Sequence, residues 1–396
     1  MADEPVQLDH HFLQNPHDNF ARCRALAPVV PAVQGKFLRG WLVTGYKDIR
    51  ALLTDPRVSK DYTGGLALHP PEASAGLAPT MHDHMLHADP PRHTRLRKLV
   101  GKVFTARAVA QLKPKIEQIT EQLLDDMAGT VTVDLMEAFA FPLPITVICE
   151  LLGIPFSDRA EFQAWTKVIM SSVQPAEAHA VSRAMTAYLD RLIDSKRIDP
   201  GSDLLSDLVH VSNEGDQLNQ AELAGMALLL LAAGFDTTAH AIGNSVIALL
   251  HHPEQLKALR ANPSLLPAAV EELLRFDGVI NIGTLRFTTE PVQLDDVEIP
   301  AGQFVWLSLL AANRDSDRFP EPDQLEIHRP ANGHLGFGHG IHHCLGAPLA
   351  RLELQIALGR LFDRYPNLTL LDNATNLRWR HSTLIHGVDQ LPIQLR

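Results

Sequence analysis

One stretch constrains this chain more than any other, the run FGHGIHHCLGAPLAR at residues 337–351. A glycine-punctuated loop presents Cys344, and a helical pattern begins directly behind it and ends near Tyr365-Pro366. Cys344 therefore lies at or just before a helix N-terminus, where unpaired N–H groups and the helix dipole favour a thiolate. Gly346 has no side chain, so a large flat ligand can approach the backbone closely there.

A thiolate presented in this way suits a single axial bond to a haem iron, where it favours O–O cleavage. Two other interpretations compete with it. A lone cysteine is commonly a small buried hydrophobic residue. A zinc site is the second, with candidate ligands His339, His342, His343 and Cys344. Structural zinc needs four converging ligands at spaced intervals, whereas three consecutive side chains diverge, and the chain has no CxxC pair.

The whole run decides between them, because it resembles the haem-binding loop of the cytochrome P450 family. Phe337, the glycines, Cys344, Gly346 and the trailing Leu-Ala-Arg all match, and the resemblance extends over about residues 15–390. It implies the P450 fold, which is mainly α with smaller β-sheets. It also implies haem b, buried between the long central helix and the helix after the cysteine loop. Cys344 is then the axial ligand of the iron, with Phe337 and Gly346 in the haem-binding set.

Length and composition favour one soluble domain over residues 1–396, since no repeat, low-complexity tract or flexible linker divides the chain. Hydrophobic residues make up 45% of the sequence, which is ample for a large core. The formal charge of −11 argues against general nucleic-acid binding. Three scattered cysteines are too few for a disulfide framework, so a reducing cytoplasm fits.

The sequence also predicts that the protein is not attached to a membrane. Its first five residues are acidic and lack the basic and apolar regions of a signal peptide. The longest apolar run, from Ala224 to Phe235, is shorter than the roughly 18 residues that a membrane span needs, and it ends at Asp236. We therefore expect a cytoplasmic location.

The first half of the chain reads as a small β-sheet beside a mostly helical body. Phe20–Leu26 and Tyr46–Leu53 have helical patterns, and Trp41–Thr44 has that of a strand. Residues 61–90 read as a long loop, which by resemblance roofs the substrate pocket. Further helices are expected at Val109–Met127 and Ala178–Ile193, with breaks at Pro142, Pro144, Pro155 and Pro175.

A helix that opens after Asp89-Pro90-Pro91 carries His93 and Arg97 at i, i+4, so both point from one face and could hold an anion. A solvated basic face is the alternative. The resemblance assigns His93 and Arg97 to the haem propionates, together with Arg286 and His342. Residues 92–107 contain six Lys or Arg and no acidic residue, which is a candidate docking face for an acidic electron donor.

A long helix is predicted over residues 219–250, opened by the capping pair Asn219 and Glu222. Inside it, AGFDTT combines a glycine with a threonine, Thr237, whose hydroxyl can bond back to the carbonyl of Ala233. The bare pattern is also typical of plain packing. By resemblance it is the oxygen-activation motif, with Thr237 and Asp236 as the catalytic pair, Asp236 in the proton pathway, and Ala233 against the haem.

Glu272 and Arg275, at i, i+3 on one helix, form a possible surface ion pair. The resemblance makes them a buried structural pair, joined by a third member that we identify as Arg329. Strands are expected at Leu285–Thr288, Val292–Leu294 and Gln303–Leu309.

The resemblance predicts a haem-thiolate monooxygenase that inserts one oxygen atom from O2 into a hydrophobic organic molecule by hydroxylation or epoxidation. Its substrate is expected to be a polyketide or macrolide intermediate of secondary metabolism, with a steroid, terpenoid or fatty acid as the alternative. Separate ferredoxin and ferredoxin reductase partners are implied, because the chain has no fused flavin or iron–sulfur segment, and the protein is expected to be a monomer. A peroxide-driven peroxygenase, a haem sensor and a zinc hydrolase remain as rival interpretations.

Overall fold

The computed structural model describes residues 4–35, 38–69, 82–170, 175–211, 215–371 and 377–396. The chain forms two compact units, each built from separated parts of the sequence. The first unit contains residues 1–59, 120–141 and 237–396, and the second contains residues 60–119 and 142–236. The boundary falls inside the long helix α12 (Gln220–His251), between Asp236 and Thr237. A single domain over the whole chain stays a prediction.

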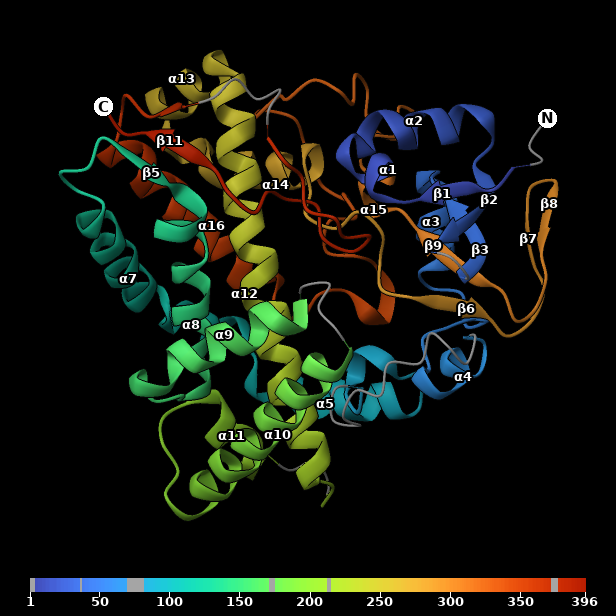
Figure 1. Ribbon diagram of the computed structural model, residues 1–396, viewed down its shortest axis with the longest axis horizontal. Coiled ribbons are helices and arrows are strands. Elements are labelled where there is room, and N and C mark those ends of the chain that lie inside the picture. The colour runs from blue at the N-terminus through green and yellow to red at the C-terminus, as the bar shows by residue number, and fades with distance from the viewer. Residues whose placement is uncertain (1–3, 36–37, 70–81, 171–174, 212–214, 372–376) are drawn as a thin grey trace. The chain divides into compact units, whose positions relative to one another are not determined.

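The first unit is built around a six-stranded sheet in the order β1-β2-β3-β9-β6-β4 (Figure 1). Its strands are β1 (Val6–Leu8), β2 (Val29–Gln34), β3 (Leu38–Val43), β9 (Phe304–Leu307), β6 (Arg286–Thr288) and β4 (Val58–Ser59). Strand β3 pairs with β2 in antiparallel and with β9 in parallel orientation. Gly40 permits the second pairing, because a Cβ there would lie 2.4 Å from the carbonyl oxygen of Phe304.

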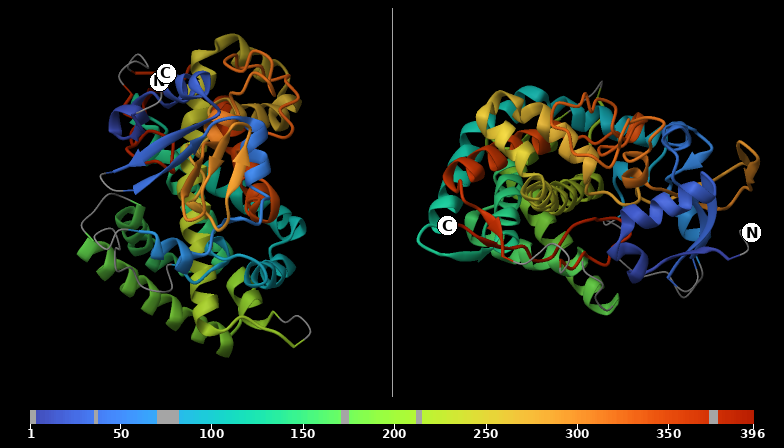
Figure 2. Two further views of the ribbon diagram at one scale, coloured as in Figure 1. Left: turned by 90° about the vertical axis from the view of Figure 1, so that its right-hand side faces the viewer. Right: turned by 90° about the horizontal axis from the view of Figure 1, so that it is seen from above.

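The sheet buries one face against the helix α3 (Tyr46–Leu52). Ile49 and Leu52 on this helix join Val43, Val305 and Leu307 in one apolar cluster. Two smaller sheets complete the unit: β10 (Thr369–Leu370), β11 (Pro392–Gln394) and β5 (Thr132–Asp134), in the order β10-β11-β5, and the hairpin of β7 (Val292–Leu294) with β8 (Val297–Ile299). Figure 2 shows the blue and orange strands of the large sheet side by side.

The described helices of the first unit include α1 (His10–Gln14), α2 (Pro16–Leu26), the π-helical turn η4 (Met136–Ala140), α13 (Pro253–Ala261), η6 (Pro263–Leu265), α14 (Leu266–Phe276), α15 (Leu309–Ala312), η7 (Gly340–His342) and α16 (Ala347–Arg364). The second unit includes α4 (Tyr62–Ala67), η3 (Met85–His87), α5 (Arg92–Val103), α6 (Ala106–Gln111), α8 (Pro142–Leu152), η5 (Phe156–Asp158), α9 (Arg159–Met170), α10 (Pro175–Ile198) and α11 (Leu204–His210). Helix α7 (Lys113–Asp126) crosses from the second unit to the first.

Two expectations for the helices were wrong, and prolines explain both. The single helix expected at Val109–Met127 is divided into α6 and α7. Pro114 stands at the second position of α7, where its missing N–H is tolerated, but it would remove a hydrogen bond from one continuous helix. The second wrong expectation is a helix break at Pro144. This proline lies inside α8, in its first turn, where no N–H has an intrahelical acceptor and proline is therefore tolerated.

The loop predicted at residues 61–90 contains two short helices, α4 and η3, and its residues 70–81 lie outside the described part. Strand and helix bounds otherwise differ from expectation mainly at their ends. Helix α2 begins at Pro16, four residues before the predicted Phe20, because proline is favoured at the first turn.

Helix α12 is the longest element, and the right-hand view of Figure 2 looks nearly along it. Asn219 and Glu222 cap it as predicted. The Glu222 N–H donates to Asn219 Oδ1 (2.9 Å), and the Asn219 N–H donates to Glu222 Oε2 (3.0 Å). By length and composition α12 is the one described helix that could cross a membrane, but 72% of its most apolar window is buried. The buried core helix of a soluble protein can have the same length and apolar composition.

Candidate functional site

The loop before α16 presents Cys344 with an exposed thiol. Its turn depends on Gly338 and Gly340, which have φ angles of 69° and 73°, values that residues with a Cβ rarely adopt. The Cys344 N–H donates to the carbonyl of Phe337 (2.9 Å) and closes the loop. Helix α16 begins three residues later, as the sequence predicted, so its dipole favours a negative charge near the sulfur.

An ion-pair network braces this loop from α14. Arg351 on α16 donates from Nε to Glu271 Oε1 (2.6 Å) and from Nη2 to Oε2 (2.8 Å). His334 Nε2 lies 3.1 Å from the same carboxylate, and the Arg351 guanidinium lies 4.5 Å from the centre of the Phe337 ring. The pKa of Arg351 is raised first by its hydrogen bond to Glu271 and also by the charge of Cys344. The same interaction stabilises a thiolate at Cys344.

Neither competing interpretation of Cys344 fits this geometry. An exposed thiol is not a packing residue, in contrast to Cys23 and Cys149, which are buried. Among the described residues, the one group of three or more metal-ligating side chains that converges is His17, Asp277 and His386. The histidines beside Cys344 are not part of it. A single exposed thiolate backed by a helix N-terminus and Arg351 fits one axial bond to a haem iron.

The AGFDTT motif lies in the middle of α12 and interrupts its burial. Residues on either side are almost all buried, yet Ala233 is exposed and Gly234 and Thr237 are half-buried. Ala233 and Thr237 share a helix face at i, i+4, so they form a small uncovered stripe on a core helix. Asp236 is buried, with 2% of its surface exposed. A flat ligand against this stripe would cover it, which fits the predicted position of Ala233 beside a haem.

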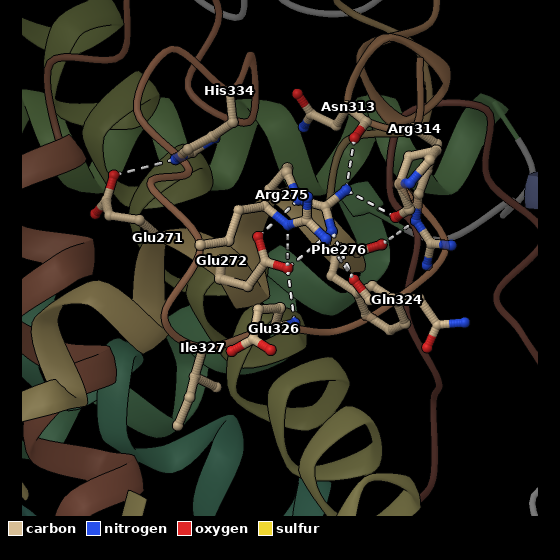
Figure 3. A network of polar contacts seen from close by, with 12 residues as sticks. Glu271, Glu272, Arg275, Phe276, Asn313, Arg314, Gln324, Glu326, Ile327 and His334 are labelled. Atoms are coloured by element: carbon tan, nitrogen blue, oxygen red, sulfur yellow. Dashed lines mark hydrogen bonds and ion pairs between the residues drawn. The ribbon is translucent and has the colours of Figure 1, made fainter. Parts of the chain in front are cut away.

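Glu272, Arg275 and Arg329 come together in the first unit, and Figure 3 shows the Glu272–Arg275 pair with the loops around it. Arg275 donates from Nε and Nη2 to the two carboxylate oxygens of Glu272, at 2.7 and 2.9 Å. Arg329 Nε donates to Glu272 Oε1 at 3.1 Å. Both side chains of the Glu272–Arg275 pair are 0% exposed. Arg275 Nη1 also donates to the carbonyl of Asn313 (2.9 Å), so the pair fixes the loop after α15.

The four predicted propionate ligands divide between the two units. Arg286 on β6 is buried and His342 on η7 is half-buried, both in the first unit. His93 and Arg97 follow one another by one turn on α5 in the second unit. Burial lowers the pKa of His93, and the neighbouring charge of Arg97 lowers it further. At neutral pH His93 is therefore a neutral hydrogen-bonding group and Arg97 a cation.

The basic stretch of residues 92–107 is partly neutralised. Arg92 pairs with Asp83. Arg95 donates to both carboxylate oxygens of Asp216, at 2.7 and 2.9 Å, and to Glu222 Oε1 at 2.6 Å. These two arginines tie α5 to other parts of its unit, so a docking face has to rest on the remaining four basic residues: Arg97, Lys98, Lys102 and Arg107.

Sequence reasoning missed a stack of rings in the segment that precedes α5. The Tyr62 ring lies 3.8 Å from that of His82 at an interplanar angle of 10°. His87 lies 5.9 Å from Tyr62, and His84 lies 4.7 Å from His87. Burial lowers the pKa of His87 to about 2, so its ring is neutral. The signal in the sequence was three histidines within six residues, at positions 82, 84 and 87.

Comparisons with known proteins agree with this geometry. The family model described as "Cytochrome P450" matches residues 162–375. Cytochrome P450 107B1 of Saccharopolyspora erythraea is 49% identical over 98% of this chain and 97% of its own. Vitamin D(3) 25-hydroxylase of Pseudonocardia autotrophica is 46% identical over 97% and 94%. The solved structure of the bacillaene polyketide synthase cytochrome P450 PksS of Bacillus subtilis 168 has a TM-score of 0.92 at 36% identity, covering 98% of both chains. The chain therefore belongs to the cytochrome P450 family of haem-thiolate monooxygenases.

Proposed function

We propose that this P450 hydroxylates or epoxidises a hydrophobic polyketide or macrolide intermediate of secondary metabolism, using haem b as its cofactor. Bound haem supplies the activation of O2 and the transfer of one oxygen atom to the substrate. The observation that supports the haem-thiolate chemistry is the exposed thiol of Cys344 at the start of α16, beside the cation of Arg351. The substrate class is proposed from the similarity to the bacillaene polyketide synthase P450 PksS. We assign Cys344 as the residue that would ligate the haem iron, and Phe337 and Gly346 of the same loop as residues that would hold the haem.

The other site residues hold the cofactor or move protons. We assign the haem propionates to Arg286, His342, His93 and Arg97 because each can donate a hydrogen bond to a carboxylate. The Thr237 hydroxyl, on the uncovered stripe of α12, would serve as the hydrogen-bond donor on the oxygen-binding side of the haem, and Asp236 would supply protons to that hydroxyl. The burial of Asp236 supports this role. A carboxyl that is shielded from bulk water exchanges its proton mainly with the groups around it, and Thr237 follows it directly in the chain.

The electrons are proposed to come from a ferredoxin and a ferredoxin reductase. Lys98, Lys102 and Arg107 are exposed near the C-terminal end of α5 and in α6, and they offer an acidic ferredoxin a basic surface. Because they are surface charges, electron transfer should slow as salt rises. We further propose a monomer in the cytoplasm, with no nucleic-acid or membrane partner.

A steroid-like substrate is the second candidate, because the relative named vitamin D(3) 25-hydroxylase is 46% identical. A spectral titration separates the two. Substrate binding next to the haem would be followed as a shift of the main absorption band. Macrolactones and linear polyketide acids are expected to give saturable shifts, and vitamin D3 and other sterols only weak ones. A strong shift with sterols alone would replace the polyketide proposal.

The haem-thiolate assignment is tested by the absorption of the reduced, carbon-monoxide-treated protein. The wild type should show the far-shifted band of thiolate-bound haem, and Cys344→Ser should lose it. Cys23→Ser and Cys149→Ser serve as matched controls and should keep it, because both thiols are buried. A Cys344→Ser protein that retains the band would contradict the assignment.

A parallel assay tests the rival peroxygenase. Product is measured with ferredoxin, reductase and NAD(P)H in one arm and with hydrogen peroxide alone in the other. Turnover should be faster with the electron-transfer partners. Equal or faster turnover with peroxide would favour the peroxygenase.

A further inference from the structure

Two histidines converge on one carboxylate oxygen outside the haem site, entirely within the first unit. His17 Nε2 lies 2.8 Å from Asp277 Oδ1, and His386 Nε2 lies 2.9 Å from the same oxygen. Their ligand atoms all lie within 4.8 Å of one another. The three residues are 260 and 109 positions apart in the sequence, so only the fold brings them together.

Each of the three side chains is held by a different element. His17 is in the first turn of α2, Asp277 is the C-cap of α14, and His386 belongs to the C-terminal segment. The ring of Trp379 stacks on His386, with 4.1 Å between centroids and an interplanar angle of 14°. Asn244 Nδ2 donates to the carbonyls of His386 (3.0 Å) and Asp277 (3.3 Å). The group is therefore supported before any ligand arrives.

The dimensions suit a small divalent cation. Zinc prefers imidazole nitrogen and carboxylate oxygen at about 2.0–2.2 Å, which places neighbouring tetrahedral ligand atoms about 3.3 Å apart. The observed separations from Asp277 Oδ1 to the two nitrogens are 2.8 and 2.9 Å, so the carboxylate oxygen and each nitrogen need to part by about half an ångström. All three ligand atoms lie within 4.8 Å of one another, so the two nitrogens are also close enough to share one ion after side-chain adjustment. Two histidines, one carboxylate and a solvent molecule form the donor set of zinc sites that keep their fourth position open to solvent.

Access and charge are also compatible with an ion. The His386 side chain is 1% exposed and Asp277 is 11% exposed, but His17 is 25% exposed, so an ion and its water ligand can enter from the His17 side. Arg314 carries a positive charge that acts on His17 and Asp277. Its Nη1 donates to Asp323 at 2.8 Å and its Nε to the carbonyl of Phe276 at 2.7 Å, so it is anchored and its charge is offset.

We propose that His17, Asp277 and His386 bind a zinc ion with solvent as its fourth ligand, and that the ion ties the start of α2 and the C-terminal segment to the end of α14. On zinc binding each imidazole would carry its one proton on Nδ1, so that Nε2 exchanges its hydrogen bond to Asp277 for a bond to the ion. The ion would then cross-link segments that lie far apart in the chain. Helix α14 also carries Glu271, Glu272 and Arg275, so the site stabilises the helix on which the Cys344 loop depends.

The test uses the full-length, haem-loaded protein. Bound zinc is first removed with a chelator, and the protein is then incubated with excess ZnCl2 and desalted. Zinc and iron are measured by mass spectrometry, and the iron content gives the number of haem-loaded chains. We expect one additional zinc per iron in the wild type and loss of that zinc in Asp277→Asn and His386→Gln. His17→Gln provides a third variant at a partly exposed position that is less demanding for folding.

The matched control is His10→Gln. His10 is exposed and its ring lies 5.7 Å from that of His11 and 5.3 Å from that of His381, so it belongs to a surface group that could retain zinc nonspecifically. This variant should bind as much zinc as the wild type. Zinc at 100 times its Kd should also raise the Tm of the wild type by about 3 °C, and not that of His17→Gln.

Two results would overturn the proposal. One is a wild type that retains no more zinc than His17→Gln, which leaves a hydrogen-bonded cluster without a metal. The other is zinc that is lost in His10→Gln and kept in His17→Gln, which assigns the binding to surface histidines.

Discussion

Arg275 and Glu272 form a fully buried, two-bond ion pair, with Nε to Oε2 at 2.7 Å and Nη2 to Oε1 at 2.9 Å. Because both groups are removed from water, each needs other partners as well. Glu272 also accepts from Arg329 Nε and from the Glu326 N–H, and Arg275 also donates to backbone carbonyls. Arg275 donates to the carbonyls of Asn313 and Pro322, both at 2.9 Å. The pair thus joins α14 to two loops, and we expect it to contribute to the stability of the fold.

We predict that Glu272→Gln lowers the free energy of unfolding by about 3–5 kcal/mol, because it leaves the Arg275 charge buried without its partner. Denaturant unfolding followed by circular dichroism measures the change. Glu254→Gln is the control, since Glu254 lies 4.0 Å from Lys257 in an exposed pair and should have no measurable effect. Equal effects of the two substitutions would contradict the prediction.

A second prediction concerns acid stability through Glu271. Burial alone would raise the pKa of this carboxyl, but hydrogen bonds from Arg351 and His334 lower it from 4.5 to about 2. A carboxyl whose pKa is lower in the folded state stabilises the protein above its unfolded pKa, and this contribution is lost as the pH falls toward the folded value. The stabilisation that Glu271 provides is therefore lost between about pH 5 and about pH 2.

Glu271→Gln removes this titration. At pH 7 the variant should be less stable than the wild type by about 2–3 kcal/mol, allowing for partial solvent screening. The difference should shrink steadily as the pH is lowered from 5 to 3. Unfolding free energies of both proteins measured at pH steps test this, and a difference that stays constant with pH would refute it.

The sequence predicted those parts of the site that are local. Asn219 and Glu222 are three residues apart, and capping geometry alone determines how they meet. The loop of Cys344 could be predicted equally well, because its glycines and the helix that follows are adjacent in the sequence. Arg329 was identified only through the family resemblance, although its contact with Glu272 spans 57 positions.

Contacts between distant segments could not be read from the pattern. His17 and His386 look like ordinary surface residues in the sequence, and only the C-cap position of Asp277 beside both segments makes them a cluster. The strands β1 and β11 have three residues each, too few to show alternation, so their pairing depends on partners elsewhere in the chain. The break between α6 and α7 was different, since Pro114 was visible and its effect was overlooked.

A third prediction concerns the backbone of the cysteine loop. In Gly340→Ala, the added Cβ would lie 2.7 Å from Thr54 Cγ2 and 3.0 Å from the Leu53 carbonyl oxygen, at a φ angle of 73°. We expect a loss of about 1–3 kcal/mol in stability and a smaller fraction of chains with thiolate-bound haem. Gly101→Ala is the control, because Gly101 is helical with open space around its Cβ position, and it should be neutral or slightly stabilising.

The last prediction separates the chemistry of Thr237 from its packing. Thr237→Ala removes the hydroxyl from the uncovered stripe of α12 while the helix remains intact, since alanine is the strongest helix former. If the hydroxyl helps to deliver protons to bound oxygen, product formation with ferredoxin and reductase should fall by roughly 10²-fold. Electron consumption should fall less, so the ratio of product to NAD(P)H should drop.

Thr237→Ser keeps the hydroxyl and should retain most of that ratio, which makes it the matched control. Hydrogen peroxide provides the oxygen already reduced, so Thr237→Ala should lose little of any peroxide-driven activity. A residue that acted only by packing would give a different result, because alanine and serine are similar in size and would then behave alike in both assays. Equal product-to-electron ratios for the two variants would therefore exclude a catalytic role for the Thr237 hydroxyl.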